Sequence, residues 1–506
     1  MTFGGGWRGA VLAGAFLLVA CGGHAGAATA GSAVGGHAAA PQARASATSA
    51  GDWPRFDYDA QRTGVGPSST GVTAANVGSL AVRTVQLDGT VDASAIELHS
   101  ILVAGRTRDV IIVTTTYGKT IALDPGSGAK LWEFVPGDIG GYQGSAQVTT
   151  ATPIADPDRR YVYAASPDGF IHKLTVAGGR QVWARRITFD PSKEKIASAL
   201  NFNGGAVIAV TGGYYGDAPV YQGHLVTIDA RTGRIRHVWN SLCSQIHHLI
   251  NPPSSCSQSD SAIWARAGAV VEPGSGRLLV ATGNGDFNGS TDWGDSVLEL
   301  SADGARLLHN WTPTDQASLN ANDTDLGSTA PALLPTTGGY RLAVQGGKDG
   351  QLHLLNLNRL NGTRGGAGGR LGGEVSEISA PGGEVFTAPA VWSHGAQRYV
   401  FVATDGGTAA YALRTAGHPH LSVQWHNGTP GTSPVLAGGL LYVYDEVNGS
   451  LNVYDPTSGH ALASLAAAGG HWNSPIAVGG RVILPVGNYM SHATSGQLEI
   501  YHLPGR

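Results

Sequence analysis

One stretch of the sequence carries closely spaced oxygen-bearing side chains of the kind that bind a hard cation. From Asn284 to Asp295, oxygen ligands fall at loop positions 1, 3, 5 and 9, Gly289 stands at position 6 and Asp295 stands at position 12. This order resembles an EF-hand calcium loop, in which Glu is usual at the last position. Asn at the first position lowers the charge, and Asp is shorter than Glu. The pattern predicts a calcium site, and the alternative is an ordinary turn rich in Asn, Asp and Gly.

Residues 1–21 have the pattern of a secretory signal. Arg8 gives a short positive region, an apolar run follows, and the segment ends in Leu-Val-Ala-Cys21, which resembles a bacterial lipobox. Cys21 is therefore expected to carry lipid, and the alternative is an ordinary cleavage site further on. Residues 22–50 are rich in Ala, Gly and Ser and are expected to form a flexible tether, which leaves 51–506 as the folded domain.

The sequence contains two further cysteines, Cys243 and Cys256. If Cys21 carries lipid, export permits these two to form a disulfide. His247 and His248 lie between them, so a Cys/His metal site is the alternative, although the spacing matches no standard zinc motif.

The composition excludes several classes of protein. Lys and Arg number 32 against 36 Asp and Glu, and this small negative charge argues against nucleic acid as the main partner. Gly numbers 75 and charged residues make up 13%, which suits short strands joined by tight turns better than a helical bundle. The sequence has no P-loop, His-Glu-x-x-His, Gly-x-Ser-x-Gly or Cys-x-x-Cys-His motif.

A repeated unit runs through residues 52–506. Its clearest copy has a strand, the turn Asp124-Pro-Gly-Ser-Gly128, and a second strand that ends in Trp132. The Asp side chain caps the turn and Gly takes a positive φ, so the unit predicts a β-hairpin. Related copies occur at Gly179 and Trp183, at Asp229, Gly233 and Trp239, and at Asp455 and Gly459.

The spacing of these units predicts an all-β, eight-bladed β-propeller of four-stranded blades. Seven blades are expected at about residues 93–135, 147–190, 194–240, 262–312, 328–380, 386–428 and 431–465. The eighth would combine residues 472–503 with the strand at 80–87, so that N- and C-terminal strands pair and close the ring.

These repeats resemble the pyrroloquinoline quinone (PQQ) repeats of the quinoprotein alcohol dehydrogenase superfamily, in which the Trp of each unit packs between adjacent blades. The opening DWPRFDYDAQRTGVG is also similar to the start of that family. The resemblance covers about residues 52–506 and implies an eight-bladed propeller. It implies less about activity, because the superfamily includes cofactor-free members.

The resemblance implies site residues for PQQ and a Ca²⁺ or lanthanide ion. Thr282-Gly283-Asn284 matches the motif that supplies a metal ligand, and Asp323 and Asp325 match the catalytic Asp stretch. Asp323 would be the general base that accepts the alcohol proton, and Asp325 a metal ligand. Lys348 matches the basic residue that contacts the quinone oxygens.

The sequence also departs from the family pattern. Asp217 stands near the place of the acidic metal ligand, which is usually Glu, and its offset differs. Trp264 represents the Trp beneath PQQ but lies about two positions out of register. The adjacent Cys pair typical of many of these dehydrogenases is absent, and without a haem motif electrons would need a separate acceptor.

Two functions follow from these features. The first is a PQQ- and metal-dependent oxidation of a small alcohol, with Asn284, Asp323, Asp325 and Lys348 expected to meet at one cavity. The second is a non-catalytic scaffold or binding lipoprotein, similar to the propeller of the outer-membrane barrel assembly machinery, with envelope proteins as partners. In both, the protein is expected in the periplasm or cell envelope, where it touches the membrane only through its lipid.

Overall fold

The computed structural model describes residues 51–217, 219–252, 254–360 and 371–505. The predicted signal, the tether and Cys21 lie outside these residues. Within the described ranges, no helix is both long and apolar enough to span a bilayer.

Within the described part of the chain, thirty-two strands form eight sheets of four antiparallel strands each. The first four sheets comprise β2 (Ile96–Val103), β3 (Arg106–Thr114), β4 (Thr120–Leu123) and β5 (Lys130–Phe134); β6 (Ile154–Ala155), β7 (Tyr161–Ser166), β8 (Phe170–Thr175) and β9 (Gln181–Arg186); β10 (Asn201–Asn203), β11 (Ala206–Val210), β12 (His224–Asp229) and β13 (Ile235–Asn240); and β14 (Val270–Val271), β15 (Leu278–Ala281), β16 (Val297–Leu300) and β17 (Leu307–Trp311).

The remaining sheets follow the same order. They comprise β18 (Ala332–Leu333), β19 (Leu342–Gln345), β20 (Gln351–Asn356) and β21 (Ser376–Ser379); β22 (Ala390–His394), β23 (Gln397–Thr404), β24 (Gly407–Arg414) and β25 (His420–Asn427); β26 (Val435–Ala437), β27 (Leu440–Asp445), β28 (Ser450–Tyr454) and β29 (Ala461–Ala466); and β30 (Ile476–Val478), β31 (Arg481–Val486), β32 (Gly496–His502) and β1 (Ala81–Leu87). The helices are α1 (Gln316–Ala321) and the short 3₁₀ turns η1 (Val77–Ser79), η2 (Ile139–Gly141), η3 (Leu326–Ser328) and η5 (Tyr489–Ser491).

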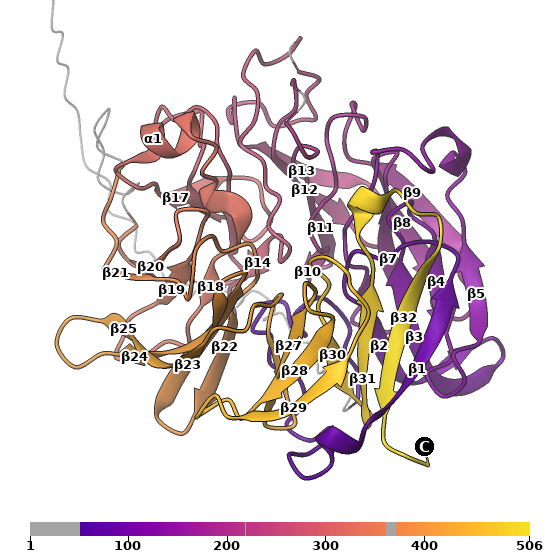
Figure 1. The fold of residues 1–506 in the computed structure, drawn as a ribbon. Coiled ribbons are helices and arrows are strands. Elements are labelled where there is room, and N and C mark those ends of the chain that lie inside the picture. Colours follow the sequence, from indigo (N-terminus) through magenta and orange to yellow (C-terminus); the bar gives the residue numbers. More distant parts are fainter. Residues whose placement is uncertain (1–50, 218, 253, 361–370, 506) are drawn as a thin grey trace, which may run out of the picture. The chain divides into compact units, whose positions relative to one another are not determined.

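The eight sheets are the blades of a propeller, which confirms the predicted fold and blade boundaries (Figure 1). In seven blades the first strand is the inner one, and β6, β18 and β26 are wholly buried. The last blade has the order β1-β32-β31-β30. There β1 pairs along its whole length with β32, with Val82 opposite Tyr501, so the two ends of the domain close the ring as predicted.

Tryptophans on outer strands tie one blade to the next. The indole N–H of Trp132 donates to the carbonyl of Val176 at 2.8 Å, and its ring covers Gly179 in the next blade. The same packing recurs between Trp183 and Gly233, and between Trp425 and Gly459. Trp239 differs: it stands six residues after Gly233 rather than four, and packs within a core cluster that includes Leu225.

The segment of residues 53–66 crosses the ring and bonds to the inner strands in chain order. Its backbone bonds join Trp53 to Glu97 of β2, Pro54 to Ala155 of β6, Ala60 to Val271 of β14, Thr63 to Val391 of β22 and Gly64 to Leu436 of β26. The side chain of Gln61 donates to the carbonyl of Leu333 in β18, and Asn201 of β10 donates to Ala60. This one segment therefore bonds to the inner strands of seven blades.

We expect Gly179→Ala to destabilise the propeller by about 2 kcal/mol. Gly179 has a φ of 65°, and an added Cβ would lie 2.5 Å from the Trp132 ring. Gly178→Ala is the matched control, because a Cβ at Gly178 meets no atom within 4 Å. Urea unfolding of the two variants measures the difference. Equal unfolding midpoints would contradict the proposed role of the tryptophan contact.

Candidate functional site

A cavity of about 620 Å³ opens among the loops that lead into the inner strands. Thr150, Ala197 and Trp264 line it and precede β6, β10 and β14, whereas the crossing segment contacts Ala155 and Val271 within such strands. The cavity and the crossing segment therefore lie toward opposite ends of the inner strands.

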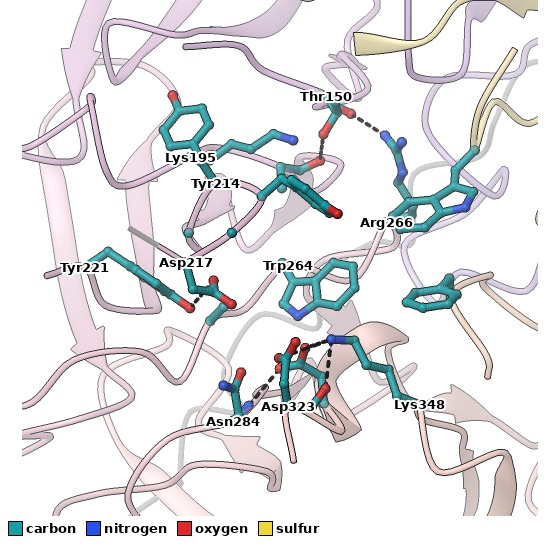
Figure 2. Close-up of a pocket in the computed structure, with 18 of the residues that line it drawn as sticks. Thr150, Lys195, Tyr214, Asp217, Tyr221, Trp264, Arg266, Asn284, Asp323 and Lys348 are labelled. Atoms are coloured by element: carbon teal, nitrogen blue, oxygen red, sulfur yellow. Dashed lines mark hydrogen bonds and ion pairs between the residues drawn. The ribbon is translucent and has the colours of Figure 1, made fainter. Parts of the chain in front are cut away.

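The structure brings all the residues that the family resemblance singled out to this cavity. They are Asp325 and the five residues labelled in Figure 2 as Asp217, Trp264, Asn284, Asp323 and Lys348. The expected convergence is thus present, and the chemical roles assigned to these residues stay predictions.

Four of these residues form a lysine–carboxylate cluster: Asn284, Asp323, Asp325 and Lys348. The Lys348 ammonium lies 2.6 Å from Oδ2 of Asp325 and 3.3 Å from Oδ1 of Asp323. Asp325 also accepts the backbone N–H of Asn284 at 2.8 Å. The Asp325 side chain is 6% exposed and that of Asp323 is 63% exposed, so Asp325 is fixed in the wall while Asp323 is open to an incoming molecule.

Burial controls the charge of this cluster. It raises the pKa of Asp325, and Lys348 only partly opposes that effect. For Lys348, burial would lower the pKa, but Asp325 and then Asp323 raise it above its usual value. Lys348 therefore stays protonated at neutral pH.

Asp217 adds a further carboxylate to the same cavity. Its Oδ1 accepts the hydroxyl of Tyr221 at 2.9 Å. Burial raises the pKa of Asp217, and the negative charges of Asp323 and Asp260 add to the rise. Carboxylates that are buried and repel one another in this way would be stabilised by a bound cation.

Aromatic rings form one wall of the cavity. Trp264, Phe386 and Trp472 make up this aromatic wall, with the rings of Phe386 and Trp472 stacked at 4.9 Å between centroids. The ring centroid of Trp264 lies 6.1 Å from that of each of the other two rings. The Nζ atom of Lys348 lies over the Trp264 ring, 5.8 Å from its centroid, so a cation and flat apolar surfaces line the same cavity.

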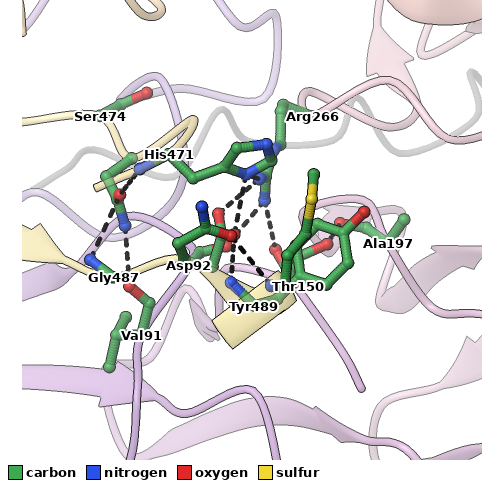
Figure 3. Close-up of polar contacts among 12 residues, drawn as sticks. Val91, Asp92, Thr150, Ala197, Arg266, His471, Ser474, Gly487 and Tyr489 are labelled. Carbon is green, nitrogen blue, oxygen red and sulfur yellow. Dashed lines mark hydrogen bonds and ion pairs between the residues drawn. The ribbon is translucent and has the colours of Figure 1, made fainter. Parts of the chain in front are cut away.

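The sequence analysis missed a second polar group across Trp264 from the cluster. Arg266 donates to the backbone carbonyl of Asp92 at 2.7 Å and forms an ion pair with its carboxylate (Figure 3). His471 Nδ1 lies 2.8 Å from the other carboxylate oxygen, and the backbone N–H of Tyr489 donates to it. Although burial opposes it, the charge of Arg266 holds the pKa of Asp92 below its usual range.

Only part of this group had a signal in the sequence. Arg266 follows Trp264 by two residues, and alternate residues of an extended segment face the same way. Asp92 and His471 lie near the two ends of the domain, and ring closure alone brings them together.

The loop from Asn284 to Asp295 does not support the calcium-loop hypothesis. Asn288 Oδ1 accepts backbone N–H groups of its own turn, among them that of Thr291 at 2.8 Å. Asp292 Oδ1 accepts from Cys243, and Asp295 Oδ1 accepts from Leu326. Burial raises the pKa of Asp295 to about 8. Among the described residues, no three His, Cys, Asp or Glu side chains gather as a metal cluster.

The predicted disulfide between Cys243 and Cys256 is present, with the two Cα atoms 6.2 Å apart. The Cys/His metal site that was its alternative is therefore wrong.

Comparisons with known proteins agree with this architecture. A family model named PQQ_2, described as "Outer membrane protein assembly factor BamB", matches residues 118–306. Residues 118–306 therefore carry PQQ-type repeats, and the fold around them is an eight-bladed β-propeller. Comparison of the propeller sequence with curated proteins gives no match.

Solved structures similar to this propeller include quinoprotein dehydrogenases. Quinohemoprotein alcohol dehydrogenase from Comamonas testosteroni has a TM-score of 0.65 at 16% identity, over 92% of this chain and 82% of that one. Quinohemoprotein alcohol dehydrogenase ADHIIG from Pseudomonas putida HK5 has a TM-score of 0.65 at 14% sequence identity, over 90% of this chain and 81% of that one. A europium-containing methanol dehydrogenase has a TM-score of 0.63 at 15% sequence identity, over 89% of this chain and 97% of that one. At these identities the likeness shows the fold.

In this propeller we expect Lys348→Met to raise the pKa of Asp325 by about one unit or more, because the variant removes the cation that opposes burial. Carbon NMR of aspartate carboxyls would follow the titration. Lys130→Met, which removes a surface lysine paired with Asp88 and Glu133, is the control and should leave Asp325 unchanged. An unaltered Asp325 titration in Lys348→Met would refute the assigned coupling.

Proposed function

We propose that this chain is a PQQ- and metal-dependent oxidoreductase that acts on small alcohols. The observation that carries the proposal is the juxtaposition, in one cavity, of the aromatic wall with the lysine–carboxylate cluster. The similar fold of the quinoprotein dehydrogenases supports it.

The residues present fit such a cofactor. PQQ is a flat, carboxylated quinone, and the aromatic wall offers flat surfaces against which it would pack. Lys348 and Arg266, on opposite sides of Trp264 in Figure 2, supply positive charge for its anionic groups. A Ca²⁺ or lanthanide ion prefers oxygen ligands, and Asp217, Asn284 and Asp325 would supply them.

Each residue of the cluster has a distinct part in the proposed chemistry. PQQ, when bound, supplies the quinone that accepts hydride from the alcohol. The exposed carboxylate of Asp323 accepts the hydroxyl proton as general base. Lys348 holds that carboxylate in place and stabilises negative charge that develops beside it. Asp325 is buried and holds both Lys348 and the backbone of Asn284. Electrons would then leave to a separate acceptor.

The second candidate function is a non-catalytic envelope scaffold. The description of the matching family model, an outer membrane assembly factor, favours it for residues 118–306. Its partners would be envelope proteins, and the cavity would bind no quinone.

The two functions differ in a direct binding test. Purified protein is mixed with PQQ and either Ca²⁺ or La³⁺, and tryptophan fluorescence and dye-linked alcohol oxidation are recorded. We expect quenching and turnover. Asp323→Asn should keep the quenching but lose at least about 100-fold in kcat, because the proton acceptor is gone. Exposed Asp138→Asn is the control and should retain full turnover. Neither quenching nor turnover with either metal would reject the oxidoreductase and favour the scaffold.

We further propose that the protein is exported and held to a membrane of the cell envelope by lipid on Cys21, with residues 22–50 as the tether. Cys21→Ser should release the protein from the membrane fraction without changing its thermal unfolding, because the described blade strands all lie within residues 81–502. Ser32→Ala, a conservative change within the predicted tether, is the control and should leave the protein on membranes. Retention of Cys21→Ser on membranes after high-salt washing would disprove the lipid anchor.

A further inference from the structure

A buried lysine faces the cavity across Trp264 from the proposed catalytic cluster. Lys195 lies in the loop before β10, and its backbone is fixed by two hydrogen bonds with Gly212, of 2.6 and 2.9 Å. The residue is 6% exposed and lines the cavity. Figure 2 shows Lys195 and Arg266 on one side of Trp264, with Asn284, Asp323 and Lys348 on the other. Lys195 is therefore separate from the proton-accepting group.

The amine of Lys195 has no anionic partner of its own among the described residues. Its Nζ lies 3.9 Å from the ring centroid of Tyr489. The nearby carboxylate of Asp92 already accepts from Arg266, His471 and the backbone of Tyr489. No hydrogen bond or ion pair of Nζ is seen within the described ranges, so the amine is free to react with a molecule in the cavity.

The charges around Lys195 favour its neutral form. Burial and then the positive charge of Arg266 lower its pKa to about 7, and Asp92 offsets this only in part. His471 and Tyr489 face Asp92 or the amine. Tyr214 and Tyr215 also line the cavity, and the Tyr214 hydroxyl donates to the carbonyl of Pro191. A lysine that is desolvated beside another cation is a nucleophile near neutral pH.

We propose that Lys195 is an amine nucleophile that forms an imine with an aromatic aldehyde bound in the cavity. The nitrogen lone pair attacks the carbonyl carbon and a C–N bond forms. The carbonyl oxygen leaves as water with the two amine hydrogens, and C=N replaces C=O. No oxidant, quinone or metal enters this step, so it is independent of the proposed oxidoreductase function.

The aromatic wall determines the class of aldehyde. Trp264, Phe386 and Trp472 line the same cavity as Lys195, and the Tyr489 ring lies directly beneath the amine. An aromatic ring on the ligand would pack against these surfaces while its carbonyl meets Nζ.

The test uses the purified protein without PQQ or metal, with benzaldehyde as probe and cyanoborohydride to reduce the imine to a stable benzyl amine. Peptide mass spectrometry then measures the labelling of each lysine at pH 7. We expect Lys195 to react at least about tenfold faster than Lys193, because the half-buried Lys193 ammonium donates a hydrogen bond to the carbonyl of Pro219 at 2.7 Å, whereas the Lys195 amine has no such partner among the described residues. Lys193 stands two residues away on the same loop and is the internal control.

Two further measurements keep the result specific. The labelling rate of Lys195 should reach half its maximum near pH 7. Lys195→Arg removes the primary amine but keeps a long basic side chain, and it should abolish only the fast labelling, with circular dichroism and thermal unfolding reporting an intact fold. Equal rates for Lys195 and Lys193, a Lys195 rate with no midpoint near pH 7, or fast labelling that survives in Lys195→Arg would each overturn the proposal. A failure to bind PQQ would leave this result unaffected.

Discussion

The backbone hydrogen bonds between residues 53–64 and the inner strands are the constraint on which the ring depends. Three of the inner strands, β6, β14 and β18, have only two residues, so their pairing within a blade fixes little of the angle to the neighbouring blade. A single segment that bonds seven of the inner strands in chain order fixes their angular positions together. The cavity lies toward the other end of these strands, so the geometry of its loops follows from that segment.

This segment carries unusual buried charge. Arg62 donates to the carbonyls of Phe56 and Leu200, and burial followed by the charge of Arg55 lowers its pKa to about 9. Burial likewise raises the pKa of Asp57, although Arg62 opposes this. Burying polar groups is costly unless they are bonded, so the arginine is held in a unique place by the carbonyls it satisfies. Specific bonds of this kind define the position of the segment more sharply than apolar packing would.

The cavity combines groups that the chain supplies from distant blades, and its two sides differ in charge. Near Lys348, carboxylates outnumber cations, and their pKa values rise mainly because they are buried. Near Arg266, the single carboxylate of Asp92 is shared by several donors. A ligand that spans Trp264 would therefore meet a side suited to cations and hydroxyl groups and a side with an unpaired amine.

The fold could be predicted from the sequence because the Asp-to-Trp hairpin recurs, and each copy fixes a local turn whose physics is independent of its surroundings. Asn284, Asp323, Asp325 and Lys348 could be named because family motifs contain them. The six-residue spacing from Gly233 to Trp239, instead of four, was a sequence signal that Trp239 packs differently from Trp132 and Trp183, and the prediction from the repeat did not use it. The pattern also predicted a calcium loop from Asn284 to Asp295 that the structure does not support. Residue spacing shows which oxygens are close in sequence, but not which backbone N–H groups donate hydrogen bonds to them. Arg266, Asp92, His471 and Lys195 carry no motif, and their environment arises only from the closed ring.

The pairing of β1 with β32 has a consequence for how the protein is made. Residues 81–87 are synthesised long before their partners at 496–502, so the first strand must wait unpaired while the other seven blades form. Such non-local pairing is slow, and an unpaired strand edge can associate with another chain. A nascent chain that lacks residues 496–502 would thus hold seven complete blades and still have an exposed strand edge, which makes the synthesis of β32 the step at which the ring closes.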